Sequence, residues 1–491
     1  MRLDHLLSEI DVQFDQASAI TCVDMTLDSR QVIDGSLFVA LQGTSDHGMH
    51  YVSDAISAGA VAVIYDEWAE DIPQQIPALR INGLRQKLGH LAQAFYGNPA
   101  DQMRVIGVTG TNGKTTVVHL IAQLAEHIGV RAACIGTLGV SIGAEKLLNS
   151  DRTTPDAITL ASMFADLKNR EVELVAMEVS SHALDQFRVD GVSFDAAVMT
   201  NLSRDHLDYH GTMEAYGHAK ERLFHDFPIQ SAVLNADDEY CRQVVSSISE
   251  SQVITYGRDA DSVRIRAIVP TRAGTQFEVE IDGQVHRVES DLLGEFNASN
   301  LVAAFASLYS LFPESSSKLL EAIPRLNAAP GRMESFSIPD SPTVVVDYAH
   351  TPDALSNALS TCRQHAHGNL WCVFGCGGDR DTGKRPLMGS IAEELSDYVI
   401  LTSDNPRSEP PQQIIDNIRE GMANAPHLVE FDRSKAIEYA LHHAAANDLV
   451  LLAGKGHEST QVIGQQMLTH SDRAEVARLF GLLGQGVQHA S

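Results

Sequence analysis

Residues 104–129 read RVIGVTGTNGKTTVVHLIAQLAEHIG, and this stretch decides the fold. Residues 105–108 form a short apolar run that suits a buried parallel strand. From Val117 to Ile128 apolar residues recur at spacings of three and four, which predicts one helical stripe that ends at Gly129. A buried strand, a glycine-rich turn and a helix in this order predict an open, parallel α/β sheet.

The turn between this strand and this helix has the groups that bind a nucleoside triphosphate. Glycines free backbone N–H groups, the helix start adds the positive end of its dipole, a lysine adds a charge, and a hydroxyl can face Mg²⁺. The loop is a shorter variant of the common G-x-x-x-x-G-K-[ST] pattern, because Val108 stands where its first glycine would fall. A β–α turn without a ligand is the alternative, and Gly-Lys-Thr-Thr at a helix start disfavours it. The predicted phosphate-binding residues are Gly110, Thr111, Asn112, Gly113, Lys114, Thr115 and Thr116.

Length and composition predict a multidomain enzyme without a polyanionic partner. The chain has 491 residues, 44% of them hydrophobic, which is too long for one core. Its formal net charge of −28 disfavours nucleic acid or an anionic membrane surface as the main partner. Six scattered cysteines without metal-type spacing indicate a reduced, cytoplasmic setting. The N-terminus has no signal-peptide pattern, and no run is long enough to span a bilayer.

Two breaks divide the chain into three expected domains. A Tyr-Gly-Asn-Pro turn at 96–99 and an Ala-Ala-Pro-Gly turn at 328–331 interrupt the alternation of apolar runs and helical segments. We therefore expect an N-terminal domain at 1–97, a central nucleotide-binding domain at 98–330 and a C-terminal α/β domain at 331–491.

In the central domain, polar residues follow the apolar runs. Glu178 ends one run, and Asp205 and His206 follow the next. Because ligands of open parallel sheets bind at the carboxyl ends of the strands, Glu178 and His206 are expected to converge on the phosphates with Thr115. A helix cap or a solvated group is the alternative for each residue alone. Lys220 lies on a predicted helix, where a surface position is the default.

The C-terminal domain shows five short apolar runs, at 343–346, 370–374, 398–401, 428–431 and 449–453. The loops that follow several of them carry an excess of Arg and Lys in an otherwise acidic protein. Since arginine binds carboxylates in a bidentate manner, we expect a carboxylate-bearing substrate at the rim of this sheet. In the segment 347–355, Thr351 is placed as an N-cap and Pro352 as the first helical residue.

Taken together, these motifs resemble the Mur ligase family of cell-wall amino-acid-adding enzymes. The signposts are GTNGKTT, EVSSHAL, TNLSRDHLDYHG, the lysine in YGHAKERLF, NADD, GEFNASN, PGRME, DYAHTPDAL and AGKGHE, in that order along nearly the whole chain. The loop 404–407 (DNPR) is similar to the form in members that use meso-2,6-diaminopimelate. The resemblance implies a cytoplasmic, monomeric, ATP-dependent enzyme of peptidoglycan synthesis, and hence of cell shape and division. It would join that amino acid to the D-Glu γ-carboxylate of UDP-N-acetylmuramoyl-L-alanyl-D-glutamate through an acyl phosphate.

The resemblance also implies roles for individual residues. Lys114 would hold the phosphates, and Lys220 would be carbamylated to N6-carboxylysine. Two Mg²⁺ ions would be held by Thr115, Glu178, His206 and Lys220. Adenine and ribose contacts would come from Asn297, Arg332 and Asp347. The UDP-muramoyl dipeptide would contact Leu27, Ser29, Thr153, Thr154, Ser180, Gln186 and Arg188, and diaminopimelate would contact Arg380, Asp404, Asn405, Pro406, Arg407, Gly454 and Glu458.

Four other readings remain open at this point. A lysine-adding relative or a folylpolyglutamate synthase would share the central domain. A switch protein would hydrolyse ATP without forming an amide. A nucleic-acid motor is disfavoured by the acidic balance.

Overall fold

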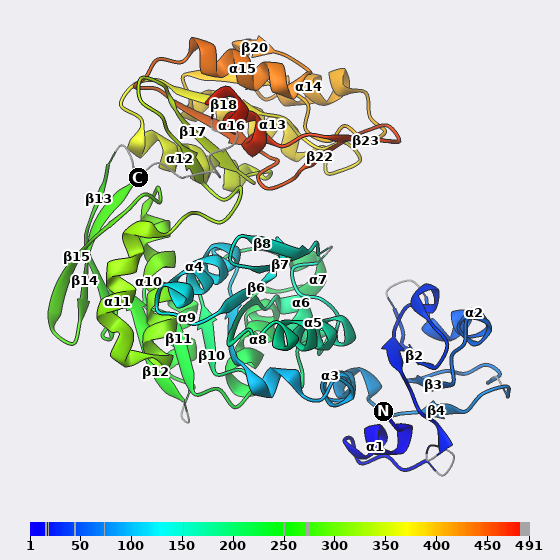
Figure 1. Ribbon diagram of the computed structural model, residues 1–491. Coiled ribbons are helices and arrows are strands. Elements are labelled where there is room, and N and C mark those ends of the chain that lie inside the picture. Colours follow the sequence, from blue (N-terminus) through cyan, green and yellow to red (C-terminus); the bar gives the residue numbers. More distant parts are fainter. Residues whose placement is uncertain are drawn as a thin grey trace. The chain divides into compact units, whose positions relative to one another are not determined.

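The computed structural model describes residues 1–14, 17, 19–43, 46–72, 74–150, 152–248, 251–271 and 274–481, and it confirms the α/β class (Figure 1). The chain forms two compact units, Met1–Ile254 with Ser310–Pro313, and Thr255–Tyr309 with Glu314–Ser491. The boundaries expected near residues 97 and 330 stay a prediction. No helix within the described residues is long and apolar enough to cross a membrane.

The first unit begins with a small parallel sheet in the order β1-β2-β3-β4. Its strands are β1 (Asp24–Thr26), β2 (Ser36–Ala40), β3 (Ala62–Tyr65) and β4 (Ala78–Arg80). The helical segments are α1 (Leu3–Ser8), η2 (Ser29–Gln31), η3 (Gly48–Tyr51), α2 (Val52–Ser57), α3 (Leu84–Phe95) and η4 (Pro99–Gln102). Leu84, Leu88 and Leu91 of α3 lie in one buried cluster with Ala157 and Ile158 of α5 (Ala157–Asn169), so apolar packing joins this part to the next.

The larger sheet of the first unit has the order β11-β10-β5-β9-β6-β7-β8. Its strands are β5 (Arg104–Thr109), β6 (Ala132–Gly136), β7 (Gly139–Ile142), β8 (Glu145–Leu148), β9 (Leu174–Glu178), β10 (Ala196–Met199) and β11 (Ser231–Asn235). Pairing is parallel from β11 to β6 and antiparallel at β7 and β8. The helices are α4 (Lys114–His127), α6 (Ser181–Asp185), α7 (Leu207–His210), α8 (Met213–His225) and α9 (Glu239–Val245). β5 lies between β10 and β9, so the loop after β5 opens where the strand order reverses, which is the usual ligand position.

The second unit opens with an antiparallel meander and a long helix. These are β13 (Val263–Pro270), β14 (Thr275–Ile281), β15 (Gln284–Ser290) and α10 (Glu295–Leu311). β12 (Gln252–Gly257) carries the chain from the first unit to the second. The short segments η5 (Pro313–Ser315), α11 (Ser316–Ala322) and η6 (Ile323–Arg325) follow α10.

A six-stranded sheet with helices on both faces forms the rest of the second unit, in the order β16-β17-β21-β18-β19-β20. Its strands are β16 (Glu334–Phe336), β17 (Thr343–Asp347), β18 (Leu370–Phe374), β19 (Tyr398–Leu401), β20 (Leu428–Val429) and β21 (Leu449–Ala453). One face packs on α12 (Pro352–His365), α13 (Lys384–Leu395) and α14 (Pro411–Arg419), and the other on α15 (Arg433–His443) and α16 (Asp472–Leu479). The hairpin β22 (Thr460–Ile463) and β23 (Gln466–Thr469) follows β21.

Most predicted elements are confirmed, with two differences. Thr351 is the N-cap of α12 and accepts from the Ala354 N–H, as predicted. The strand expected at 428–431 stops at Val429, where the chain turns and Phe431 is left exposed. Lys220, for which the residues alone favoured the surface, is 1% exposed. That default was wrong because α8 turns this lysine toward the phosphate loop. All six cysteines are buried and free.

Candidate active site

The loop between β5 and α4 is held open by glycines in conformations that other residues avoid. Gly110 has φ of 136° and Gly113 has φ of 88°. A Cβ on Gly110 would lie 1.9 Å from the Thr200 hydroxyl oxygen, so a side chain would collide there. The Asn112 backbone is fastened to the end of β10, because its N–H donates to Asn201 Oδ1 at 2.9 Å and its carbonyl accepts from Thr200. The loop is therefore fixed before any ligand binds, as electrostatic catalysis requires.

Two lysines from different helices meet at one carbonyl oxygen of this loop. Lys114 Nζ donates to Gly110 O at 2.8 Å, and Lys220 Nζ donates to the same oxygen at 2.9 Å. Burial, together with the charge of Lys114, lowers the pKa of the Lys220 amine well below its usual range. Lys220 also lies 4.5 Å from the ring centre of Tyr216, whose hydroxyl is 3.2 Å from the Thr111 hydroxyl. Burial and the charge of Lys114 therefore both favour the neutral form of this amine over its charged form.

Glu178, at the end of β9, contacts the first turn of α4 through its carboxylate. It is 1% exposed, and its Oε1 accepts from the Thr115 hydroxyl at 3.0 Å and from the Thr137 N–H at 2.8 Å. Hydroxyl and carboxylate oxygens are what a small hard cation prefers. No group of three or more His, Cys, Asp and Glu suited to a metal occurs among the described residues. The Thr115 hydroxyl and the Glu178 carboxylate fit Mg²⁺ that would take its other oxygens from nucleotide phosphates and water.

His206 lies in a cluster of rings beside the loop. It adopts φ of 51°, and its side chain is 47% exposed and 3.5 Å from the Asp205 carboxylate. Its ring centre is 4.9 Å from that of His182 and 6.0 Å from that of Tyr216. Through Tyr216, His206 and Lys220 occupy the same neighbourhood, as the motif order implied.

Five of the seven residues predicted to contact the UDP-muramoyl dipeptide form one hydrogen-bonded network next to Glu178. Thr154 donates to the Glu178 carbonyl at 2.9 Å and accepts from the Ser180 N–H at 3.1 Å. Arg188 donates to Thr154 O at 3.1 Å and to Gln186 Oε1 at 2.5 Å. Thr153 joins the same network, since its hydroxyl lies 3.1 Å from that of Thr137, which in turn donates to Glu178. Burial, with Arg152 nearby, lowers the pKa of Arg188, and an anionic ligand would offset that cost.

The two residues expected at the uridine end lie in the small N-terminal sheet region. Leu27 follows β1 and packs against the buried cluster of that part. Ser29 begins η2, whose N-cap Asp28 accepts from the Arg30 N–H. Both side chains are only partly buried, so each can face a ligand.

The predicted adenine and ribose contacts belong to the second unit. Asn297 is buried in α10 and donates to Leu293 O at 2.9 Å. Arg332 lies 4.8 Å from the ring centre of Tyr348, and its Nε is buried without a hydrogen-bond partner among the described residues. Asp347 ends β17 and accepts from the Met333 N–H at 2.7 Å. Burial raises the pKa of Asp347, while the charge of Arg332 opposes that shift.

The loops after β18, β19 and β21 converge at one edge of the six-stranded sheet, as predicted. Asn405 donates to Glu458 at 2.8 Å, and Arg407 donates to Gly378 O at 2.7 Å with φ of 52°. Arg380 is exposed on the same loop as Gly378. A Cβ on Gly454 would lie 2.7 Å from Asp404 Oδ2, so this glycine makes room for the carboxylate. Pro406 continues the loop, and its carbonyl lies against Gly378.

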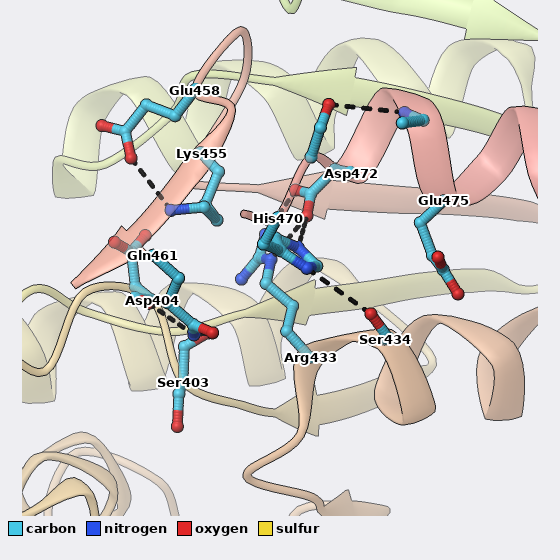
Figure 2. Close-up of polar contacts among 12 residues, drawn as sticks. Ser403, Asp404, Arg433, Ser434, Lys455, Glu458, Gln461, His470, Asp472 and Glu475 are labelled. Atoms are coloured by element: carbon cyan, nitrogen blue, oxygen red, sulfur yellow. Dashed lines mark hydrogen bonds and ion pairs between the residues drawn. The ribbon is translucent and has the colours of Figure 1, made fainter. Parts of the chain in front are cut away.

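Sequence reasoning missed several residues of both sites. Thr137 links Glu178 to Thr153, and nothing in its local sequence marks it. Lys455 is one of the basic residues that the sequence indicated for the rim, but its burial was not predicted: it is fully buried and donates to Glu458 at 2.9 Å. The buried pair of Arg433 and Asp472 joins the starts of α15 and α16 (Figure 2). A helix that begins with a charged residue beside an N-cap Asp is too common a pattern to have revealed it.

Comparison with protein families gives three matches that together cover most of the chain. The Mur ligase family catalytic domain matches residues 23–96, the Mur ligase middle domain matches 108–308, and the Mur ligase glutamate ligase domain matches 331–456.

Individual relatives agree with this. UDP-N-acetylmuramoyl-L-alanyl-D-glutamate–2,6-diaminopimelate ligase of Alkalilimnicola ehrlichii is 44% identical over 471 residues, covering 93% of this chain and 94% of the relative. The enzyme of the same name from Chromobacterium violaceum is 45% identical over 452 residues, or 91% of each chain. A solved structure of an enzyme with that name aligns with a TM-score of 0.72 at 36% identity, over 98% of this chain and 99% of the other. A folylpolyglutamate synthase from Mycobacterium tuberculosis shares the fold at 19% identity, with a TM-score of 0.61 over 79% of this chain and 94% of its own.

Proposed function

This chain belongs to the Mur ligase family, and on that premise we propose that it joins 2,6-diaminopimelate to UDP-N-acetylmuramoyl-L-alanyl-D-glutamate. The reaction consumes ATP and forms an amide at the γ-carboxylate of D-Glu. One observation carries the proposal: Thr115 and Thr153 are joined through Glu178 and Thr137 by hydrogen bonds. A phosphate site and a dipeptide site that share these residues would bring the D-Glu carboxylate next to the γ-phosphoryl group that it accepts.

The residues of the loop support phosphoryl transfer to a carboxylate. A carboxylate is a poor acyl donor, because its leaving group would be oxide. In the first step the γ-carboxylate oxygen of D-Glu bonds to the ATP γ-phosphorus, and the bond to the β–γ bridging oxygen breaks to release ADP. Lys114 and the backbone N–H groups of residues 110–116 stabilise the charge that accumulates on the transferred group. Arg188 and Thr154 would orient the dipeptide, so that the two reacting groups meet in line.

The second step forms the amide. The free amine of the amino acid attacks the acyl carbon, a tetrahedral intermediate forms, and inorganic phosphate leaves while the amine loses a proton. Arg407 would bind the distal carboxylate of diaminopimelate, and Glu458 would accept from its amino group. Arg380, Asn405 and Gly454 would complete this pocket, and the meso isomer is the expected substrate.

Magnesium and a modified lysine belong to the same proposal. When bound, Mg²⁺ supplies charge neutralisation on the phosphates. Thr115 and Glu178 would hold one ion, and His206 together with Lys220 the second. Lys220 would serve as a ligand after its neutral amine adds CO₂, which forms an N–C bond and releases one proton to give a carbamate. The buried position of Lys220 beside Lys114 supports this.

The decisive experiment is ADP release with the UDP-muramoyl dipeptide and either diaminopimelate or lysine, with the product identified by mass spectrometry. We expect turnover with diaminopimelate and a new peptide bond in the product. Preference for lysine, activity on a folyl substrate, or ATP hydrolysis without an amide would each reject the assignment in favour of one of the other readings. The modification of Lys220 is tested separately. Intact-mass measurement with and without bicarbonate should show a mass increase of one CO₂, and Lys220→Arg should abolish this increase.

The cellular setting and organisation follow from this function. A precursor-building ligase of peptidoglycan works in the cytoplasm and affects cell shape and division. We propose that it acts as a monomer with domain boundaries near residues 97 and 330. Light scattering would measure the mass, and limited proteolysis should cut first near those two positions.

A further inference from the structure

His206 stands at the start of α7, a helical turn that has little packing of its own. α7 comprises four residues, all of which the structure describes, and none of them is buried. His206 makes no capping hydrogen bond with its side chain and holds φ of 51°, which is uncommon for a residue other than glycine. Such a conformation persists only where surrounding contacts hold it. The place of the His206 ring therefore depends on what fastens this turn to its neighbours.

Two side chains of α7 fasten the turn to α6. The Tyr209 hydroxyl donates to Asp185 Oδ2 at 2.6 Å and accepts from Gln186 Nε2 at 3.0 Å. His210 Nε2 lies 3.0 Å from the Ser181 hydroxyl oxygen. Asp185 and Ser181 are the last and first residues of α6, and Gln186 is its C-cap. The turn is therefore held by polar contacts with one short helix.

A ring of α6 lies among the rings of α7. The ring centre of His182 is 4.2 Å from that of Tyr209, 4.9 Å from that of His206 and 5.4 Å from that of His210. The pair of His182 and His206 is edge-to-face, with 87° between the ring planes. This is one of the favoured geometries for neighbouring rings. Tyr209 and His206 therefore share His182 as a common partner, and a shift of Tyr209 would disturb the packing around His206.

The other end of the Gln186 side chain binds Arg188. Gln186 Oε1 accepts from Arg188 Nη2 at 2.5 Å and from Arg188 Nε at 3.1 Å. Because arginine offers only donors, the amide oxygen must face Arg188, and this leaves the amide N–H groups for Tyr209. A continuous chain of contacts thus runs from Arg188 through Gln186, Tyr209 and His182 to His206. Its two ends are the residues for which dipeptide binding and cation binding are proposed.

We propose that Tyr209 and His182 are positioning residues that couple the dipeptide site to the second cation site. This rests on the proposed function. A dipeptide that binds Arg188 would hold Gln186 and Tyr209 in the arrangement described above, and the α7 turn would then present His206 to the cation. Because coupling between two binding sites is reciprocal, the dipeptide and the cation would each tighten the binding of the other. Neither positioning residue needs to touch a ligand for this role.

The test measures how much the dipeptide tightens the binding of Mn²⁺, used in place of Mg²⁺. Free Mn²⁺ is quantified by electron paramagnetic resonance in the presence of a non-hydrolysable ATP analogue, with and without the dipeptide and without the amino acid. In the unaltered protein we expect the dipeptide to tighten the weaker-bound Mn²⁺ about tenfold. Tyr209→Phe keeps the ring but loses both hydrogen bonds of the hydroxyl, so the factor should fall to about twofold. Tyr209 is 41% exposed, so loss of its hydroxyl should leave the fold intact.

Tyr309→Phe is the matched control, and Mg²⁺ dependence gives a second measurement. The Tyr309 hydroxyl donates to Asp282 Oδ2 at 2.9 Å, so this variant also loses a hydroxyl–carboxylate hydrogen bond, but in the second unit. Its coupling factor should stay at the value of the unaltered protein. In steady-state kinetics, kcat of Tyr209→Phe should fall about tenfold at low Mg²⁺ and recover at high Mg²⁺, because only cation affinity is lost. The KM for diaminopimelate should not change.

Three results would overturn the inference. One is a coupling factor in Tyr209→Phe equal to that of the unaltered protein, and another is an equal reduction in Tyr209→Phe and Tyr309→Phe. The third is a loss of kcat in Tyr209→Phe that high Mg²⁺ does not restore. Absence of diaminopimelate-dependent ADP release by the unaltered protein would instead reject the proposed function, so the two failures are distinguishable.

Discussion

We propose that two regions, the phosphate loop after β5 and the rim of the six-stranded sheet, bind anionic groups, and the two are built in opposite ways. The phosphate loop is one continuous stretch, residues 110–116, whose backbone N–H groups and Lys114 would do most of the binding. The rim is assembled from three loops distant in sequence and is supported by buried cations, since Lys455 donates to Glu458 and Arg433 donates to Ala453 O. The geometry of the phosphate loop depends on its glycines, whereas that of the rim depends on buried charges. Substitutions in the two regions should therefore impair activity by different mechanisms.

The largest effect is expected in the continuous site. Lys114→Met removes the charge that we propose stabilises the transferred phosphoryl group, and we expect kcat to fall about a thousandfold, the order seen when one preorganised donor is lost. Stability should change little, because Lys114 is only partly buried. ADP release under saturating substrates measures the effect, with the exposed Lys146→Met as the control. A loss of less than tenfold would mean that the backbone alone carries the charge stabilisation.

A smaller and more selective effect is expected at the rim. Arg407→Ala removes the guanidinium expected to bind the distal carboxylate, and the KM for diaminopimelate should rise about a hundredfold, the value of a charged hydrogen bond of 2–3 kcal/mol. The KM for ATP should not change. Steady-state kinetics with each substrate varied in turn would show this, with the exposed Arg419→Ala as the control. Equal loss of affinity for ATP and amino acid would contradict the separation of the two regions.

The sequence predicts more of the phosphate loop than of the rim, because the loop is continuous in sequence whereas the rim is assembled from distant segments. Strand, turn and helix at residues 104–129 are dictated locally, so the fold of the phosphate loop and its glycines could be read from the chain. The buried position of Lys220 could not, because it depends on how α8 packs against a loop a hundred residues earlier. Its role and those of the rim residues came from resemblance to a family. The ion pair of Arg433 and Asp472 was predicted neither from local pattern nor from the resemblance, because its two residues are 39 positions apart in the sequence.

Substitution of Gly454 should combine two effects, backbone strain at a glycine and displacement of a neighbouring charged side chain. Gly454 has φ of 110°, and a Cβ there would lie 2.7 Å from Asp404 Oδ2. Gly454→Ala should therefore strain the backbone and push the carboxylate aside, and we expect about a tenfold rise in the KM for diaminopimelate with a loss of about 1 kcal/mol in stability. Gly464→Ala, also at positive φ but with open space around it, is the matched control for backbone strain alone. Equal kinetic effects in both variants would show that the contact with Asp404 does not matter.

The smallest expected effect is on folding stability in acid, because the two regions should lose stability over different pH ranges. Burial lowers the pKa of His119 in α4 to about 4, from an ordinary value of 6.5. Between these two values the unfolded chain binds more protons than the folded one, so stability falls as the pH drops from 6.5 to 4. The pKa of Asp472 is lowered as well, so its contribution is lost only below its unfolded value of 3.8. Acid should therefore weaken the phosphate-loop unit between pH 6.5 and 4, by about 2 kcal/mol after allowance for partial exposure of the ring. His119→Gln should flatten the Tm between pH 6.5 and 4 without altering turnover at neutral pH, whereas the exposed His90→Gln should not. If the Tm of His119→Gln depends on pH as strongly as that of the unaltered protein, the acid-sensitive group is another residue. The proposed difference in acid stability between the two regions would then be wrong.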